Sequence, residues 1–143
     1  MPKIDAFLKL TLEQRASDLH MPVGSPPVLR IFGDLKKVNF RELDPDLNQK
    51  LIYEILTPEQ RKLFEDKNDL DFPYAAEGIG RFRCNVLRQR KGIDITFRAI
   101  PEAIPTMEDL EFSESIKSLC DHHQGIILVT GPSGCGKTTS PPP

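Results

Sequence analysis

The segment from residue 131 to residue 138 constrains the chain most, because it follows the pattern Gly, any four residues, Gly-Lys-Thr. In this pattern the glycines let successive backbone N–H groups point at phosphate oxygens, the lysine reaches the β- and γ-phosphates, and the threonine hydroxyl ligates Mg²⁺. The sequence therefore predicts a site for ATP and Mg²⁺, with Lys137 as a catalytic residue and Thr138 as the metal ligand. The predicted nucleotide-binding residues are Gly131, Pro132, Ser133, Gly134, Cys135, Gly136, Lys137, Thr138 and Thr139.

The residues on either side of this loop define its expected context. Residues 126–130 form a short apolar run, which is typical of a buried parallel strand leading into a phosphate-binding loop. The helix expected after the loop cannot continue past Ser140, because three prolines follow it. We therefore expect a site that is cut off before completion, with residues 141–143 as a tail foreign to the fold.

Composition excludes several classes of protein. The 143 residues are 38% hydrophobic and 28% charged with a net charge of −2, so nothing favours a nucleic acid or an anionic membrane as partner. No apolar run is long enough to cross a membrane, so we expect no membrane insertion. The three cysteines are widely spaced and fit neither a zinc site nor a disulfide framework, which favours the cytoplasm. Cys135 is best interpreted as a tolerated small residue, although its place before a helix would lower a thiol pKa.

The first two thirds of the chain predict helices mixed with strands. Apolar spacing predicts a helix over residues 4–16, a short strand over 17–21, and a hairpin of residues 28–32 and 35–38 around Gly33-Asp34. Asp44-Pro45 is a typical start for a second helix, with Leu47, Leu51 and Ile55 as its buried stripe. A third helix begins at Thr57 with a capping box, anchored by Leu63 and Phe64.

Three further strands are expected over residues 70–76, 80–89 and 93–100, the last two forming a hairpin. The whole predicts an α+β domain, an antiparallel sheet with helices on one face. Alternation places Arg81, Arg83 and Arg98 together on the face opposite the apolar one. Arginine suits bidentate phosphate contacts, so this face is a candidate for approaching a nucleotide in a neighbouring subunit. The alternative is a solvated face. Because it has no interleaved aromatic residues, we do not expect nucleic-acid binding.

Two prolines, Pro101 and Pro105, mark the expected linker between domains. We expect a domain over residues 1–100, a linker over 101–107 and the start of a second domain over 108–140. A capped turn at residues 106–110 and a helix from Ser113 open the second domain, with Ile116, Leu119, Cys120 and His123 on one helical face. The histidines have no metal-ligand spacing, and no catalytic carboxylate pair is evident. His20 is expected in a strand with a satisfied hydrogen bond.

Several short motifs, each weak alone, occur in an order that resembles a known family. The chain is similar to the N-terminal portion of the retraction ATPases of type IV pili, which belong to the secretion-superfamily ATPases. The motifs are Ala-Ser-Asp-Leu-His at 16–20, Gly-Ser-Pro-Pro at 24–27, Arg-Ile-Phe-Gly-Asp at 30–34, Gly-Arg-Phe-Arg-Cys-Asn at 80–85, Phe-Arg-Ala-Ile-Pro at 97–101, Pro-Thr-Met-Glu-Asp-Leu at 105–110 and Gly-Ile-Ile-Leu-Val-Thr-Gly-Pro at 125–132.

This resemblance implies a PAS-like N-terminal domain followed by the first elements of an α/β RecA-like P-loop domain. It also implies a homo-hexameric ring at the platform of the pilus base, peripheral to the inner membrane, in which ATP hydrolysis drives pilin extraction. Arg81, Arg83 and Arg98 would then line the nucleotide cleft as catalytic residues. The family's Asp-rich box, Walker B strand and His box are not present, so we expect a fragment that does not hydrolyse ATP by itself.

Three alternatives stay open at this point. The chain could derive from another secretion-superfamily ATPase that drives pilus assembly or type II secretion. An ABC-type ATPase has a similar phosphate-binding loop sequence, but its loop comes much earlier in the chain than residue 131. A non-catalytic PAS-like interaction module is the third alternative, since most of the chain is that domain.

Overall fold

The computed structural model describes residues 2–101, 106–107, 109–118 and 124–131. Contacts divide the chain into two units, residues 1–102 and residues 103–143, and each is described here by itself.

Three helices belong to the first unit: α1 (Asp5–Glu13), α2 (Pro45–Tyr53) and α3 (Pro58–Lys67). The predicted caps explain where two of them begin. The Asp44 side chain accepts a hydrogen bond from the Leu47 backbone N–H at 2.8 Å. Thr57 and Gln60 form both bonds of the predicted capping box. These contacts satisfy N–H groups that a helix start leaves unpaired, so both helices start where the sequence predicts.

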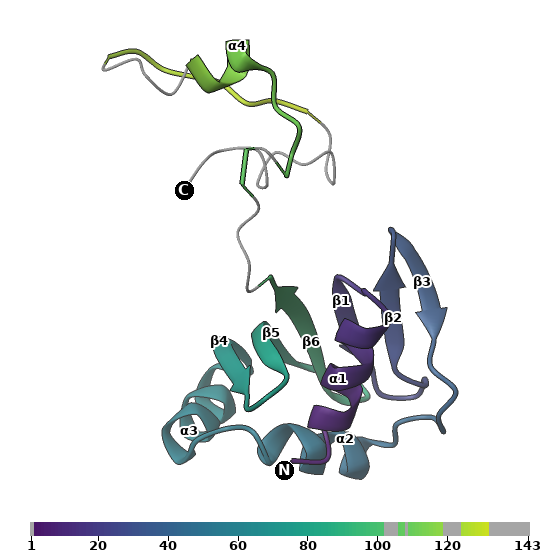
Figure 1. Ribbon diagram of the computed structural model, residues 1–143. Coiled ribbons are helices and arrows are strands. Elements are labelled where there is room, and N and C mark those ends of the chain that lie inside the picture. Colours follow the sequence, from purple (N-terminus) through teal and green to yellow (C-terminus); the bar gives the residue numbers. More distant parts are fainter. Residues whose placement is uncertain (1, 102–105, 108, 119–123, 132–143) are drawn as a thin grey trace. The chain divides into compact units, whose positions relative to one another are not determined.

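Six antiparallel strands form one sheet in the order β3-β2-β1-β6-β5-β4 (Figure 1). The long hairpin of β5 and β6 occupies one half of the sheet, as predicted. Strand β1 pairs with β2 on one side and with β6 on the other, which joins the two halves. The strands are β1 (Asp18–Met21), β2 (Val28–Ile31), β3 (Asp34–Lys37), β4 (Asp69–Ala76), β5 (Gly80–Gln89) and β6 (Gly92–Ile100).

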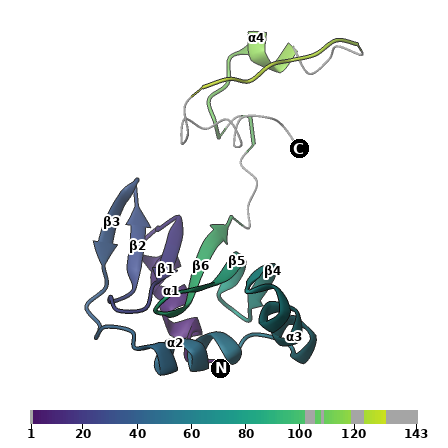
Figure 2. The same ribbon diagram turned by 180° about the vertical axis from the view of Figure 1, so that it is seen from behind.

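The hydrophobic core lies between the three helices and one face of this sheet. Alternate residues of β5 and β6 are fully buried there, and the rings of Phe82 and Phe97 meet edge to face at 6.3 Å. Helix α1 supplies Leu8 and α3 supplies Phe64, both fully buried, whereas Leu63, predicted to anchor α3, is 40% exposed. Phe64 is the one buried residue of α3, which packs against the edge strand β4. All three helices pack on this apolar face (Figures 1 and 2).

One buried amide fixes α2 to the sheet. Asn48 is fully buried, and its Nδ2 donates hydrogen bonds to the carbonyl oxygens of Met21 at 2.8 Å and Ile93 at 2.7 Å. These carbonyls belong to β1 and β6, so one side chain links α2 to the two central strands. A buried polar group with such partners specifies one arrangement of helix and sheet.

The turn between β2 and β3 differs by one residue from the prediction. The loop residues are Phe32 and Gly33 rather than Gly33 and Asp34, because Ile31 pairs with Asp34. Both loop residues have positive φ, 50° and 91°, as a two-residue turn of type I′ requires. Glycine adopts this conformation without strain, whereas Phe32 adopts it at a cost and is 90% exposed.

The two edge strands carry features that discourage further strand pairing. All four residues of β3 are exposed, and two of them are the lysines Lys36 and Lys37. The opposite edge strand, β4, contains Pro73, which has no N–H to donate. Charged residues and proline at a sheet edge are known protections against edge-to-edge association.

The second unit begins with a capped turn, as predicted. The Asp109 backbone N–H donates to Thr106 Oγ1 at 3.1 Å, and the Asp109 carboxylate accepts from the Thr106 N–H at 2.9 Å. The predicted helix from Ser113 is present as the short α4 (Glu114–Lys117). Leu119, Cys120 and His123 of the expected helical face lie outside the described residues.

The predicted strand at residues 126–130 is wrong for this structure. These residues are irregular, and Ile126, Ile127, Leu128 and Val129 are between 48% and 83% exposed. A buried strand needs neighbours on both sides to pair its backbone. The part of the second unit that the structure describes contains no strand that pairs with this run.

The strained turn gives a testable prediction. Phe32→Asn should raise the free energy of unfolding by about 1 kcal/mol, because asparagine tolerates positive φ and phenylalanine does not. Urea unfolding followed by circular dichroism measures this change. Leu35→Asn is the matched control, because Leu35 is also an exposed apolar residue of the same hairpin. Equal effects of the two substitutions would contradict the role assigned to the turn.

Candidate functional site

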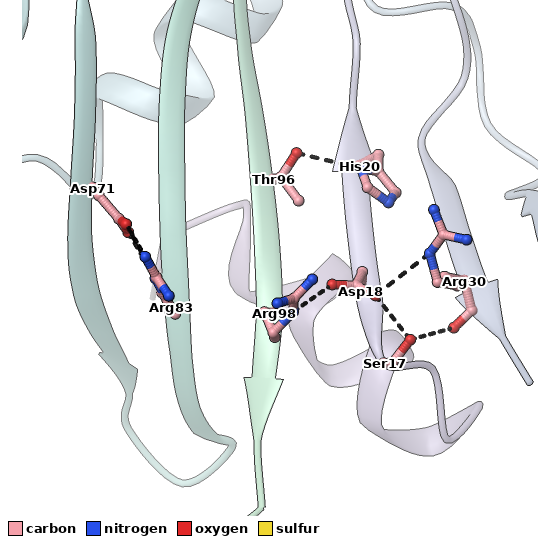
Figure 3. A network of polar contacts seen from close by, with 8 residues as sticks. All are labelled: Ser17, Asp18, His20, Arg30, Asp71, Arg83, Thr96 and Arg98. Atoms are coloured by element: carbon pink, nitrogen blue, oxygen red, sulfur yellow. Dashed lines mark hydrogen bonds and ion pairs between the residues drawn. The ribbon is translucent and has the colours of Figure 1, made fainter. Parts of the chain in front are cut away.

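The candidate site lies on the sheet face that the helices leave uncovered, which we call the arginine face. Arg81 and Arg83 project from β5 and Arg98 from β6, with Arg83 directly opposite Arg98 in the register. All three are exposed, and Figure 3 shows Arg83 and Arg98 on the same side of the sheet. The structure therefore brings the three sequence-predicted arginines onto one surface. They differ in the contacts that hold them.

Arg83 is engaged by a carboxylate from the edge strand. Its Nε lies 3.2 Å and 3.0 Å from the two oxygens of Asp71, and its Nη2 also contacts Asp71 Oδ2. This bidentate pair holds the pKa of Asp71 below its usual range, chiefly through the Arg83 hydrogen bond. Asp71 thus occupies the Nε–Nη2 edge of Arg83 and neutralises much of its charge, while the Nη1–Nη2 edge has no described contact.

Arg98 is held differently, through a single nitrogen. Its Nε donates to Asp18 Oδ1 at 2.9 Å, and Asp18 lies directly opposite Arg98 in the pairing of β1 with β6. The second oxygen of Asp18 accepts from Ser17 Oγ at 2.8 Å and lies 3.5 Å from Arg30 Nε. One carboxylate thus joins side chains from β1, β2 and β6 (Figure 3).

Asp18 is nearly buried, and its surroundings keep it ionised. Burial alone would raise the pKa of its carboxyl group, but the hydrogen bonds from Arg98 and Ser17 and the positive charge of Arg98 outweigh that effect. The net result is a pKa below the usual value. Asp18 therefore stays negative at physiological pH and serves as a fixed counter-charge between two arginines.

His20 occupies the next position on the same side of β1. Its Nδ1 lies 3.3 Å from Thr96 Oγ1, so the predicted hydrogen bond is present (Figure 3). Its Nε2 is buried and has no hydrogen-bond partner among the described residues. Burial lowers the pKa of the imidazole, and Arg30 and Arg98 lower it further, against the opposing effect of Asp18.

A shallow cavity of about 290 Å³ opens on this face, lined by Asp18, Asp71, Arg83, Asn85, Thr96 and Arg98. Its two carboxylates balance the two arginines in its wall. Elsewhere on this face Arg30 shares Asp18 with Arg98, and Arg81 has no ion-pair partner among the described residues, while Asp69 and Asp94 add two further carboxylates. The exposed guanidinium groups of this face can donate hydrogen bonds to an anion such as a phosphate group.

Several participants were missed by sequence reasoning. Asp18, Asp71 and Arg30 received no role, although Asp18 and Arg30 stand opposite each other in strands that were predicted to be neighbours in sequence. The contact between Asp18 and Arg30 could therefore have been predicted from the sequence. The contact between Asp18 and Arg98 could not, because β1 and β6 are about 80 residues apart in the chain.

Most of the predicted phosphate loop, residues 132–139, lies outside the described residues. Gly131 is described and is part of no helix or strand. In the described ranges, no three or more His, Cys, Asp or Glu side chains gather as metal ligands would. None of the helices described is both long and apolar enough to span a lipid bilayer.

Comparison with known proteins connects this fold to ATPases. No protein-family model matches the chain. The type IV pilus retraction ATPase PilT of Pseudomonas aeruginosa is 40% identical over 137 residues, which are 96% of this chain and 40% of PilT. PilU, a type IV pilus ATPase of the same organism, is 31% identical over 138 residues, covering 96% of this chain and 36% of PilU. The chain thus spans about two fifths of the length of these relatives.

Solved structures agree with the sequence matches. The pilus retraction motor PilT with bound ADP superimposes with a TM-score of 0.79 at 38% identity, over 96% of this chain and 40% of that one. The ATPase DotB of Legionella pneumophila gives a TM-score of 0.79 at 27% identity, over 95% and 39%. The chain is homologous to the ATPases PilT, PilU and DotB. Among these relatives, PilT is the protein that both the sequence motifs and the comparisons indicate.

The half-buried imidazole of His20 predicts a pH effect on stability. Because the folded state lowers the pKa of His20 below 6.5, it favours the neutral ring. This contribution is complete above pH 6.5 and is lost as the pH falls through the folded-state value. The free energy of unfolding should therefore decline between pH 7.5 and pH 5, and less steeply in His20→Gln. Urea unfolding at several pH values measures both slopes. The same slope in both proteins would show that His20 is not the responsible group.

Proposed function

We propose that this chain is the N-terminal part of a hexameric ATP-hydrolysing motor that powers type IV pilus retraction and twitching motility. The homology to PilT over 96% of the chain is the observation that carries this proposal. Residues 1–100 would be the PAS-like domain, 101–107 the linker, and 108–140 the start of a RecA-like ATPase domain. The motor would work in the cytoplasm against the platform of the pilus base.

ATP and Mg²⁺ would bind at the loop of residues 131–139. Lys137 would contact the β- and γ-phosphates, and Thr138 would ligate the metal through its hydroxyl. Bound Mg²⁺ would neutralise charge that develops on the phosphates. The bound ADP in the PilT structure supports this assignment, because it shows that a homologue binds nucleotide.

The arginine face would supply a second set of phosphate contacts, from one subunit to the nucleotide of another. Its chemistry supports this role. Arg81 has no acidic partner among the described residues. Arg98 makes no described contact through either of its terminal nitrogens, Nη1 and Nη2. Positively charged donors placed at the transferring phosphoryl group stabilise the charge of the transition state.

A second candidate function comes from the other relatives. PilU and DotB are also similar to this chain, so the same fold can serve another pilus or secretion ATPase. These alternatives share the ATP chemistry and differ in the machine that the ATPase drives. A test of motility separates them.

The first prediction concerns nucleotide binding by the 143-residue chain. It should bind ATP weakly, with a dissociation constant near the millimolar range, since the apolar run before the loop is exposed rather than part of a sheet. Lys137→Ala should weaken this binding further, because only the arginine face then contacts the phosphates. Isothermal titration calorimetry with and without Mg²⁺ measures both. Tight, Mg²⁺-dependent binding would contradict this expectation. Equal binding by Lys137→Ala and the unsubstituted chain would show that the loop does not bind the nucleotide.

The second prediction concerns the complete motor. We expect a chimera that joins this chain to the remaining part of Pseudomonas aeruginosa PilT to hydrolyse ATP and to restore twitching in a strain that lacks PilT. In this chimera Arg98→Ala should lower ATP turnover about a hundredfold, because a positioned donor to the reacting phosphate is lost. A phosphate-release assay measures turnover.

Arg90→Ala is the matched control, because Arg90 is an exposed arginine in the turn at the opposite end of the β5–β6 hairpin. This variant should retain normal turnover. Unchanged turnover in Arg98→Ala would show that the arginine face is a solvated surface with no role in ATP hydrolysis. An active chimera that fails to restore twitching would favour the other pilus and secretion ATPases.

A further inference from the structure

The arginines of the arginine face are not equivalent as ligands for phosphate. Arg83 presents Nε and Nη2 to Asp71, so a carboxylate already occupies its Nε–Nη2 edge and neutralises much of its charge. Arg98 uses only Nε, and no described contact involves either of its Nη atoms. A guanidinium held in this way keeps its Nη1–Nη2 edge for a bidentate contact with an anion.

Asp18 is well placed to hold Arg98 in a fixed orientation. Its side chain is only 7% exposed, whereas that of Arg98 is 68% exposed. Ser17 Oγ donates to Asp18 at 2.8 Å, and the strands on both sides fix the backbone of β1. An exposed arginine therefore bonds through its inner nitrogen to a carboxylate that has little freedom to move.

The pair at the edge of the sheet lacks these features. The side chains of Asp71 and Arg83 are 42% and 67% exposed, and they lie on the edge strand and its neighbour. Exposed pairs of this kind contribute little to stability and exchange easily with solvent. The same two residue types thus form one anchored pair and one exposed pair on a single face.

We infer that Asp18 is a positioning residue, which orients Arg98 so that its Nη1–Nη2 edge binds the phosphate oxygens of a nucleotide. This inference rests on the proposed function and adds to it the group that prepares the arginine for its ligand. Arg83, by contrast, pairs through both Nε and Nη2 with Asp71, a carboxylate that is itself 42% exposed and not anchored. The ligand class is a polyphosphate chain, and the free edge of Arg98 is its contact.

The charges give this inference a test whose sign is informative. A carboxylate near an anion site repels the anion, so its removal should strengthen anion binding if charge alone matters. Removal of a carboxylate that orients an arginine should weaken binding instead, because the arginine loses its fixed geometry. Asp18→Asn and Asp71→Asn make the same chemical change on the same face, so they form a matched pair.

The experiment uses the 143-residue chain with Lys137→Ala, so that the phosphate loop makes no contribution, and inorganic tripolyphosphate as the probe. Titrations followed by ¹H–¹⁵N NMR give the affinity, and the arginine Nε–H signals report on each guanidinium. Asp18→Asn should weaken binding about fivefold and speed hydrogen exchange of the Arg98 Nε–H, whereas Asp71→Asn should strengthen binding about twofold. Thermal unfolding confirms that each variant is folded.

Each result has a defined meaning. Stronger binding in Asp18→Asn, with weaker binding in Arg98→Ala, would overturn the positioning role and leave the arginine face as the phosphate contact. Unchanged binding in Arg98→Ala would remove the phosphate contact itself, and the positioning role with it. An adventitious effect of charge alone would appear as equal strengthening in Asp18→Asn and Asp71→Asn, and it would also overturn the inference.

Arg98→Lys provides a second route if Asp18→Asn does not fold. Lysine keeps the positive charge but has neither a separate inner nitrogen for Asp18 nor a planar edge for phosphate. We expect Arg98→Lys to bind tripolyphosphate as weakly as Arg98→Ala. Binding equal to that of the unsubstituted arginine would show that a charge at this position is sufficient, which would overturn the inference.

Discussion

Side chains alternate between the two faces of β5 and β6, and most other features of the first unit depend on this constraint. Phe82, Cys84 and Val86 reach the core from β5, while Arg81 and Arg83 leave on the other side. A shift of one residue in the pairing would bury the arginines and expose the phenylalanines. The hydrophobic effect that holds the helices on the sheet therefore also determines that the arginines share one exposed surface.

Local patterns were sufficient to predict much of the fold. The caps at Asp44 and Thr57 fix the starts of α2 and α3, and the alternation of β5 and β6 gave their faces and, to within one residue, their limits. The turn at Phe32 was misplaced by one residue, because a Gly-Asp pair is also a favourable turn and the register alone decides between them. The strand expected at residues 126–130 depends on neighbours that an apolar run cannot specify by itself.

In the candidate site, too, local patterns predict some features and long-range pairing determines the others. Alternation placed Arg81, Arg83 and Arg98 on one face, but it could not tell which of them is committed to a carboxylate. That difference arises from contacts between distant segments, with Asp18 joined to Arg98 across the β1–β6 pairing and Asp71 joined to Arg83 across β4 and β5. The order of the strands in the sheet therefore determines which carboxylate each arginine contacts. The homology to PilT connects these arginines to a nucleotide-binding protein.

The protected edges of the sheet have a consequence for how copies of this protein can assemble. With Pro73 in one border strand and Lys36 and Lys37 in the other, neither border offers a clean backbone for another chain to extend the sheet. In the ring that we propose, subunits would then recognise one another through side chains on broad surfaces. Such contacts would allow the proposed subunits to slide or tilt, whereas a continuous ladder of backbone hydrogen bonds would hold them in one arrangement.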